Sequence, residues 1–276
     1  MNIPAVLLSA FLLVSVAQAD SLTVMTFNVR YPSPADGGNV WENRKDILVE
    51  SIRKYQPDVL GTQELFDFQG GYIAERLPDY EWFGISRQGN HENEHMGVFY
   101  KRDELFVVES GNFWLSEDPD KAGSMSWGVS LPRMVTWARF RDLEGEEFYL
   151  YNTHFAHRRQ DAAARLNSAR VIVEDIRRRV PAFARLIVMG DFNSVPDSDV
   201  HELLTTELVD AWESGGERSG PETTLSGWSG NREGRRIDWI LYRGDWRPTS
   251  VQTVDHNLDG RYPSDHYPVV AVLEDR

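Results

Sequence analysis

Residues 186–199 read LIVMGDFNSVPDSD, an apolar run that stops abruptly on a glycine, an acid and an amide. The run Leu186–Met189 is typical of a strand with both faces covered. A strand that enters a loop needs only some polar residue there, whereas this one places Asp191 and Asn193 two positions apart. Residues i and i+2 of an extended segment point to the same side. The Asp191 carboxylate and the Asn193 amide are therefore expected on the same side of the chain at the end of this strand.

The same kinds of side chain recur where other apolar strands end or begin: Asn28, Glu64, Asn152 with His154, and Asp265 with His266. Each alone has a structural interpretation, because Asp and Asn often cap the turn after a strand. Several together predict one cluster at a sheet edge. Hard oxygen donors suit Mg²⁺ or Mn²⁺, while the absence of cysteine and the few histidines disfavour a structural zinc site.

Hydrophobic periodicity predicts many strands and few helices. Amphipathic helices are expected at 41–55 and 161–180. Strands are expected at 21–30, 57–64, 97–101, 107–115, 134–140, 147–155, 184–193, 236–243, 249–254 and 266–274. Because few helices separate these strands, we expect an α+β sandwich rather than an alternating doubly wound sheet.

Composition is that of a soluble globular protein, with 41% hydrophobic and 26% charged residues. The 276 residues could make one large domain or two small ones. A net charge of −14 argues against non-specific binding to a polyanion such as nucleic acid, although a local basic strip could still bind one. Without cysteine the chain forms no disulfide.

Residues 1–19, MNIPAVLLSAFLLVSVAQA, predict a signal peptide. The apolar run is too short to span a bilayer, and Ala17-Gln18-Ala19 has the small-residue pattern of a cleavage site. The alternative is a buried first helix. We expect cleavage near Ala19, export to the periplasm or medium of a bacterium, no transmembrane segment and a monomer.

Six motifs in order, MTFNVR, GTQE, NTHF, GDFN, RIDWI and SDHYPV, resemble the endonuclease/exonuclease/phosphatase superfamily, which includes deoxyribonuclease I. The matches run from Asn28 to Val269. The resemblance implies a four-layer α/β/β/α sandwich formed by one domain, residues 20–276. It also implies one Mg²⁺ or Mn²⁺ ion at the rim of the strands.

The resemblance gives roles to individual positions. It implies that Glu64 is the principal metal ligand and that Asn28 and Asp265 position the metal or its waters. Asp191 matches the residue that orients or deprotonates the attacking water. Asn193 matches the amide that holds a phosphate oxygen.

Further roles concern the two histidines. Asp238 and His266 match a carboxylate–imidazole pair in which the acid fixes the ring and raises its basicity. His154 lies where deoxyribonuclease I also has histidine, and we expect it to protonate the leaving alkoxide. Glu94 is the predicted partner of His154, and Asn152 is expected to contact the substrate.

Substrate choice must come from the loops, because fold and site define only the reaction class. Residues 115–137 resemble a segment of one bacterial branch of the superfamily, and Arg133 in it is a candidate phosphate contact. The alternative is a solvated arginine before a strand. We expect a secreted phosphoesterase for small or sugar-like phosphodiesters or monoesters. A secreted nuclease and an inactive binding module are the alternatives.

Overall fold

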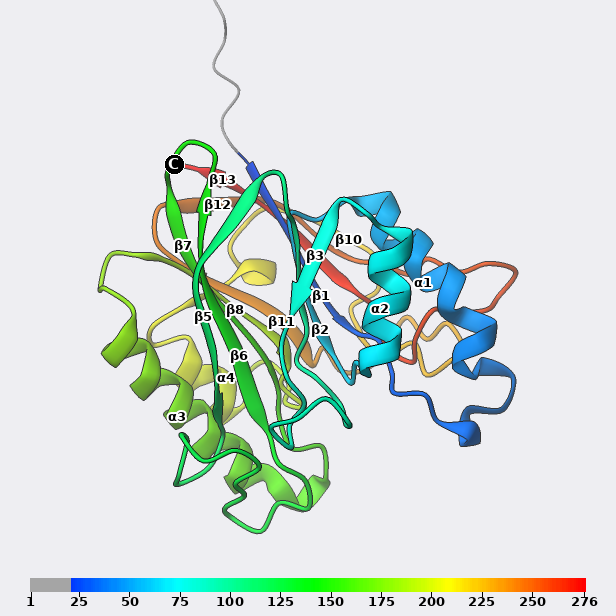
Figure 1. The fold of residues 1–276 in the computed structure, drawn as a ribbon, viewed down its shortest axis with the longest axis horizontal. Helices are drawn as coiled ribbons and strands as arrows, with labels where there is room; N and C mark the ends of the chain where they lie inside the picture. The colour runs from blue at the N-terminus through cyan, green and yellow to red at the C-terminus, as the bar shows by residue number, and fades with distance from the viewer. Residues whose placement is uncertain (1–20) are drawn as a thin grey trace, which may run out of the picture.

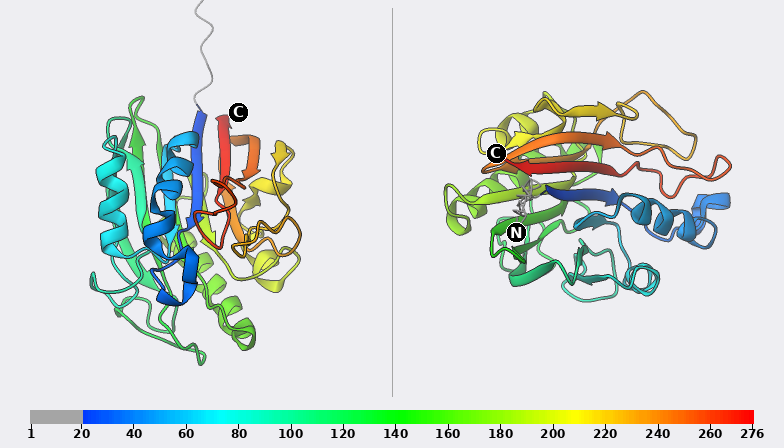
Figure 2. Two further views of the ribbon diagram at one scale, coloured as in Figure 1. Left: turned by 90° about the vertical axis from the view of Figure 1, so that its right-hand side faces the viewer. Right: turned by 90° about the horizontal axis from the view of Figure 1, so that it is seen from above.

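The computed structural model describes residues 21–276, which form two β-sheets packed face to face (Figures 1 and 2). The seven strands of the first sheet are, in spatial order, β10 (Glu217–Ser219), β12 (Trp246–Thr253), β13 (Val269–Asp275), β1 (Ser21–Asn28), β2 (Val59–Gln63), β4 (Val98–Lys101) and β3 (Tyr80–Phe83). The six strands of the second are β5 (Leu105–Trp114), β6 (Met134–Asp142), β7 (Glu147–His154), β8 (Arg185–Asp191), β11 (Asp238–Arg243) and β9 (Val209–Asp210).

Helices cover the outer face of each sheet, which gives four layers (Figure 2). The α-helices are α1 (Trp41–Tyr55), α2 (Asp67–Arg76), α3 (Ala162–Arg179) and α4 (Asp199–Leu204), and short 3₁₀ helices span Pro34–Asn39, Arg159–Asp161 and Ala211–Glu213. Helices α1 and α2 bury Leu48, Ile52 and Ile73 against the first sheet. The predicted α+β class and the α/β/β/α order of layers are therefore confirmed.

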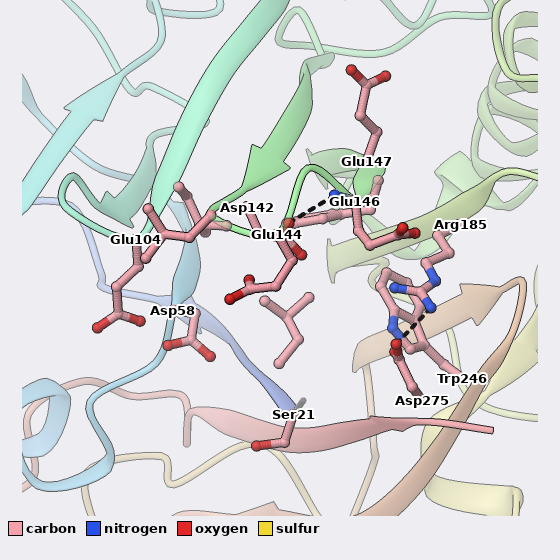
Figure 3. Close-up of a pocket in the computed structure, with 14 residues that line it drawn as sticks. Ser21, Asp58, Glu104, Asp142, Glu144, Glu146, Glu147, Arg185, Trp246 and Asp275 are labelled. Carbon is pink, nitrogen blue, oxygen red and sulfur yellow. Dashed lines mark hydrogen bonds and ion pairs between the residues drawn. The ribbon is translucent and has the colours of Figure 1, made fainter. Parts of the chain in front are cut away.

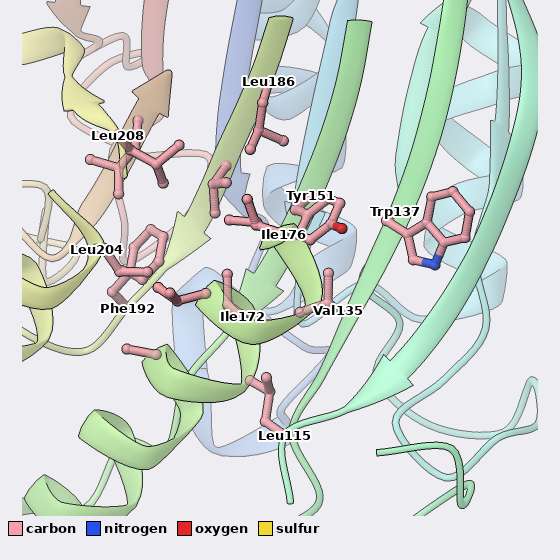
Figure 4. Packing of buried hydrophobic residues seen from close by; sticks show 14 of the residues in the cluster. Leu115, Val135, Trp137, Tyr151, Ile172, Ile176, Leu186, Phe192, Leu204 and Leu208 are labelled. Atoms are coloured by element: carbon pink, nitrogen blue, oxygen red, sulfur yellow. The ribbon is translucent and has the colours of Figure 1, made fainter. Parts of the chain in front are cut away.

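Helix α3 packs on the second sheet through one apolar face (Figure 4). Ile172 and Ile176 are one turn apart and fully buried, and they contact the sheet side that carries Tyr151 and Leu186. Burying two isoleucine side chains contributes about 3–6 kcal/mol relative to exposing them. The opposite face of the same sheet meets the first sheet through residues such as Leu150 and Ile187. Strand β8 is thus covered on both faces, as its apolar run predicted.

Helix α2 and strand β3 were missing from the sequence-based prediction, as were the short α4, β9 and β10. The sequence of α2, DFQGGYIAER, contains two glycines, which lower helix propensity. The structure explains one of them, because a Cβ on Gly70 would lie 2.5 Å from the Trp82 ring of β3. Close packing of α2 on β3 therefore requires glycine at position 70. Helix propensity, which considers the local sequence alone, does not reveal this requirement.

The order and direction of the strands gather several strand ends at one rim. Strands β1 and β2 are parallel, as are β7 and β8, so Asn28 pairs with Gln63 and His154 with Asp191 in register. Strand β11 is antiparallel to β8 and begins beside its end. The segment before β13 returns to the same rim because β13 is antiparallel to β1.

The predicted signal peptide, residues 1–19, lies outside the described residues. Within residues 21–276, no helix has the length and apolar character needed to cross a membrane.

Candidate active site

The end of β8 is shaped by Gly190. This residue has φ +150°, and a Cβ on it would lie 2.0 Å from the carbonyl oxygen of Thr153 on β7, so only glycine fits. Two residues later Asn193 adopts a left-handed conformation with φ 48°, and its backbone N–H donates to Oδ1 of Asp191 at 2.9 Å. The acid and the amide are therefore joined in one tight turn, and Phe192 between them is buried.

Three oxygen-bearing side chains converge beside this turn. Nδ2 of Asn28 lies 3.2 Å from Oε1 of Glu64 and 3.1 Å from Oδ2 of Asp191. Glu64 has φ 59°, which is uncommon for a residue with a side chain and is a form of strain found at functional sites. The backbone N–H of Tyr31 donates to the other oxygen of Glu64 at 3.0 Å. The Glu64 carboxylate is thus fixed from both sides.

Asp265 faces the same point. Nη1 of Arg30 lies 3.5 Å from Oδ2 of Asp265 and 4.0 Å from Oε2 of Glu64. Burial raises the pKa of the Asp265 carboxyl, and the nearby charge of Glu64 adds to that effect. The two acids and the Asn28 amide, predicted to surround a metal, are therefore brought together.

Asp238 and His266 form the predicted pair. Nδ1 of His266 lies 2.9 Å from Oδ2 of Asp238, and both residues are buried. Burial alone would lower the pKa of His266, but the charge and hydrogen bond of Asp238 raise it well above its usual range. The ring is therefore a cation, and its Nε2 lies 3.9 Å from Oδ2 of Asp191.

Asp191 is the centre of the cluster. Burial, followed by the charge of Asp238, raises the pKa of Asp191 to about 7. Its Oδ2 also lies 3.3 Å from Nε2 of His154 on β7. A buried carboxyl whose pKa is near neutrality, placed between two imidazoles, can exchange a proton with a bound water.

The predicted contact between Glu94 and His154 is wrong. Oε2 of Glu94 instead accepts a hydrogen bond from Nη1 of Arg87 at 2.7 Å, because a buried carboxylate is best paired with a cation. Nδ1 of His154 is buried and has no hydrogen-bond partner among residues 21–276. Burial, with the charges of Arg133 and His266, holds the pKa of His154 well below its usual range, so the ring is neutral.

The expectation that Asn152 contacts the substrate is also incorrect. This side chain is fully buried between the sheets. Its Nδ2 donates to the carbonyl oxygens of Thr62 and Gly97, both at 2.9 Å, and its Oδ1 accepts from Gln63 at 2.7 Å. The Asn152 amide therefore ties β7 to β2 across the sandwich, which positions the neighbouring strand ends.

A cavity of about 420 Å³ opens beside Glu64 and His154, and arginines line it. Arg133 is only 5% exposed. Its Nη2 bonds Nδ1 of His157 at 3.0 Å, while Nε and Nη1 have no hydrogen-bond partner among the described residues. Nε of Arg87 is also without one. The cavity therefore presents several buried N–H groups that could donate hydrogen bonds to an anion.

Sequence reasoning missed three basic residues that line this cavity: Arg30, Arg87 and His157. Arg30 is the last residue of the motif MTFNVR, and His157 lies two residues after the motif NTHF. Their closeness to these motifs could have identified them as site residues. Arg87 lies in the loop after β3, where no motif marks it. Its place at the cavity depends on the isolated bridges of His95 with Leu65 and Ser86, which fold that loop back on the rim.

A second cavity lies at the opposite end of strands β1, β7 and β8 (Figure 3). Its charged lining is mostly acidic and includes Asp58, Glu104 and Glu144, with Arg185 paired to Asp275 at 2.8 Å. The candidate catalytic side chains are at the other rim, so this cavity has no part in the site.

The fold and site together define a class. The Endonuclease/Exonuclease/phosphatase family model matches residues 25–266, which include every strand end described above. This chain therefore belongs to the endonuclease/exonuclease/phosphatase family, whose members hydrolyse phosphoesters.

Solved structures and curated relatives agree with this assignment. An endonuclease/exonuclease/phosphatase from Bacteroides vulgatus is 32% identical, with a TM-score of 0.87 over 93% of this chain and 100% of that one. A Bacteroides thetaiotaomicron mannosyl-6-phosphatase is 29% identical, with a TM-score of 0.83 over 91% and 99%. Nocturnin of Drosophila melanogaster is 25% identical over 85% of this chain, which spans 42% of that relative's length.

Proposed function

We propose that this protein is a divalent-metal-dependent phosphoesterase that acts on compact phosphomonoesters, among which sugar phosphates fit best. The metal, the catalytic residues and the substrate class rest on separate observations.

The donor set fits a hard divalent cation. Glu64 and Asp265 are carboxylates that both lie within 4.0 Å of Nη1 of Arg30, and burial makes a free Asp265 carboxylate costly, as its raised pKa indicates. Glu64 and Asp265 would hold Mg²⁺ or Mn²⁺, and Asn28, whose Nδ2 donates to Glu64, would keep the Glu64 carboxylate in position. When bound, such an ion neutralises charge that develops on phosphorus and on the leaving oxygen.

The remaining residues handle water and phosphate. Asp191 would orient a water and accept its proton, and its pKa of about 7, near working pH, supports that role. The His266 cation, charged through Asp238, would bind a phosphate oxygen, and the free N–H of the Asn193 amide would bind another. His154, whose Nε2 lies 3.3 Å from Oδ2 of Asp191, would stabilise the departing oxygen.

Arg133 is the observation that supports the substrate class. A buried guanidinium without a carboxylate partner is costly, so its retention is explained if the substrate supplies the anion. Arginine matches phosphate geometry, and a terminal phosphate presents one more free oxygen and one more charge than a diester. The 420 Å³ cavity suits a group of sugar size. The mannosyl-6-phosphatase among the structural relatives supports the same class.

A nuclease is the second candidate, and one observation favours it. On the far side of Asn193 a groove is lined by Arg165 and Arg235. Two cations that flank the phosphate position could follow a nucleic-acid backbone.

The experiment compares kcat/KM for mannose and glucose phosphates, bis-p-nitrophenyl phosphate, single-stranded DNA and plasmid DNA in Mg²⁺. Asp191→Asn protein, purified identically, excludes a contaminating phosphatase. We expect the sugar monoesters to be hydrolysed fastest. Faster cleavage of DNA would support the nuclease instead, and no turnover of any substrate would indicate a binding module.

We also propose export of the mature chain after cleavage near Ala19, on the pattern of residues 1–19. Mass spectrometry of protein from the native host should find a chain that begins near Asp20. Soluble protein that retains Met1 would contradict export.

A further inference from the structure

A second cluster of metal-ligating side chains lies outside the candidate active site. It consists of Asp67 at the start of α2, with His91 and His95 from the loop after β3. One ligand atom from each residue lies within 4.8 Å of the other two. Asp67 and His91 are exposed, whereas His95 is fully buried.

His95 is held in the manner of a metal ligand. Its Nδ1 lies 3.1 Å from the carbonyl oxygen of Leu65. A carbonyl oxygen only accepts, so Nδ1 carries the proton and Nε2 of the neutral ring carries a free lone pair. Histidines that bind metals commonly donate their other N–H to a carbonyl, which fixes the ring and its tautomer.

His91 stands at a matching distance. Its Nδ1 lies 3.3 Å from Nε2 of His95. Two nitrogens bound to one tetrahedral Zn²⁺ at about 2.0–2.1 Å are separated by about 3.3–3.4 Å. Without an ion, Nδ1 of His91 donates to His95 across the same gap. Because His91 is exposed, its ring can move the proton to Nε2 and release Nδ1 for a metal.

We propose that Asp67, His91 and His95 bind one zinc-class divalent ion, with water as the remaining ligand. Two imidazoles and one carboxylate favour Zn²⁺ or Co²⁺ over the all-oxygen preference of Mg²⁺. The proposal does not depend on the proposed function.

The bound ion would support one wall of the candidate active site. It joins the loop after β3 to the start of α2, and that loop carries Arg87 and Glu94 of the arginine-lined cavity. The backbone N–H of His95 also donates to Leu65, the residue after Glu64. Occupancy therefore stabilises the loop from which Arg87 reaches the cavity.

Equilibrium dialysis tests the proposal with tag-free protein, micromolar Zn²⁺ and a large excess of Mg²⁺ to occupy oxygen-rich sites. We expect wild type to retain one Zn²⁺ more per chain than His91→Ala, and Asp67→Asn to bind that ion more weakly. The matched control His256→Ala removes a histidine elsewhere and should bind as wild type does. Equal Zn²⁺ retention by wild type and His91→Ala would overturn the proposal.

Co²⁺ provides a readout that does not depend on activity. A tetrahedral Co²⁺ with nitrogen ligands absorbs visible light far more strongly than an octahedral, all-oxygen Co²⁺. Wild type and His256→Ala should show the strong bands, and His91→Ala should lose them while its apo melting temperature stays unchanged. Strong bands that persist in His91→Ala would place the ion elsewhere and contradict the proposal.

Discussion

Nδ1 of His266 lies 2.9 Å from Oδ2 of Asp238, and this contact joins two residues that are 28 apart in sequence. The acid comes from the start of β11 and the ring from the turn before β13. Thr224 holds the acid's backbone, since the N–H of Asp238 donates to its Oγ1 at 3.1 Å. The pair is therefore preorganised within the fold, and its charge is available before a substrate binds.

The first prediction is that Asp238 and His266 act as one unit. Asp238→Asn and His266→Ala should each lower kcat/KM about 10²–10⁴-fold, and the double variant should lose no more than the worse single one. The reason is that a ring without its acid loses its charge, and an acid without its ring has nothing to orient. Rates are measured with Asp103→Asn, an exposed acid, as the control. Fully additive losses would show that the two residues work separately.

The second prediction concerns Glu64. Glu64→Gln keeps the shape of the side chain but removes the charge that would hold the metal, so Mg²⁺-stimulated turnover should fall at least about 10³-fold. EDTA should abolish the activity of wild type, and added Mg²⁺ should restore it. Glu75→Gln on the surface of α2 is the control. Activity of Glu64→Gln that stays undiminished, or wild-type activity in EDTA, would remove Glu64 from this role.

The third prediction is that Arg133 binds the substrate phosphate and lowers the stability of the folded protein. Arg133→Met fills similar space without a buried charge, so KM for phosphomonoesters should rise at least about 10-fold while the protein becomes more stable. A gain of ~1 kcal/mol corresponds to a rise in melting temperature of about 2–4 °C in a domain of this size. Arg170→Met, which removes an exposed arginine of α3, should change neither quantity. A lower melting temperature with unchanged KM would mean that Arg133 is structural.

Sequence reasoning identified the rim because its residues carry local signals. Gly190, Asp191 and Asn193 lie within four consecutive residues, and the acid and the amide show the oxygen donors at the strand end. Helix α1 was predicted with its observed bounds, 41–55, because its apolar spacing is regular. These features depend on neighbours in sequence.

The incorrect expectations depend on contacts between distant segments. Glu94 was assigned to His154 by its distance from a strand, but the nearby cation Arg87 decides its partner. Asn152 was expected to contact the substrate because it lies in the NTHF motif, two residues before His154 at the strand end. At position 152, however, the face of β7 that carries this side chain is covered by the other sheet, and the Asn152 side chain bonds the carbonyl oxygen of Thr62 there. Side-chain partners across the two sheets could not be read from either segment alone.

The fourth prediction concerns acid stability. Burial alone would raise the pKa of Asp175, but hydrogen bonds from Arg179, Tyr151 and Arg178 lower it below its usual value. A lowered folded-state pKa contributes stability above the unfolded pKa of about 4, and that contribution is lost as pH falls through the folded value. Asp175→Asn should therefore cost about 2 kcal/mol at neutral pH and progressively less below about pH 4.

Urea unfolding at several pH values measures this difference. The neighbour Glu174 is exposed on the same helix, so Glu174→Gln is the matched control and should unfold as wild type does at every pH. A cost of Asp175→Asn that stays constant with pH would show that the ionised carboxylate is not the source of the stability.

The last prediction concerns His154, whose ring is neutral in the free protein because it is buried beside Arg133. A phosphate dianion bound at Arg133 would offset that cation and favour protonation of the ring, which could then donate its proton to a departing alkoxide. A p-nitrophenolate leaves without such help. His154→Ala should therefore slow hydrolysis of an alkyl phosphate at least about 10²-fold and that of p-nitrophenyl phosphate far less.

His157→Ala, which removes a histidine in the same cavity, is the control and should affect both esters alike. Equal losses on both esters in His154→Ala with an unchanged melting temperature would make His154 a phosphate-binding residue, whereas equal losses with a lower melting temperature would make it structural.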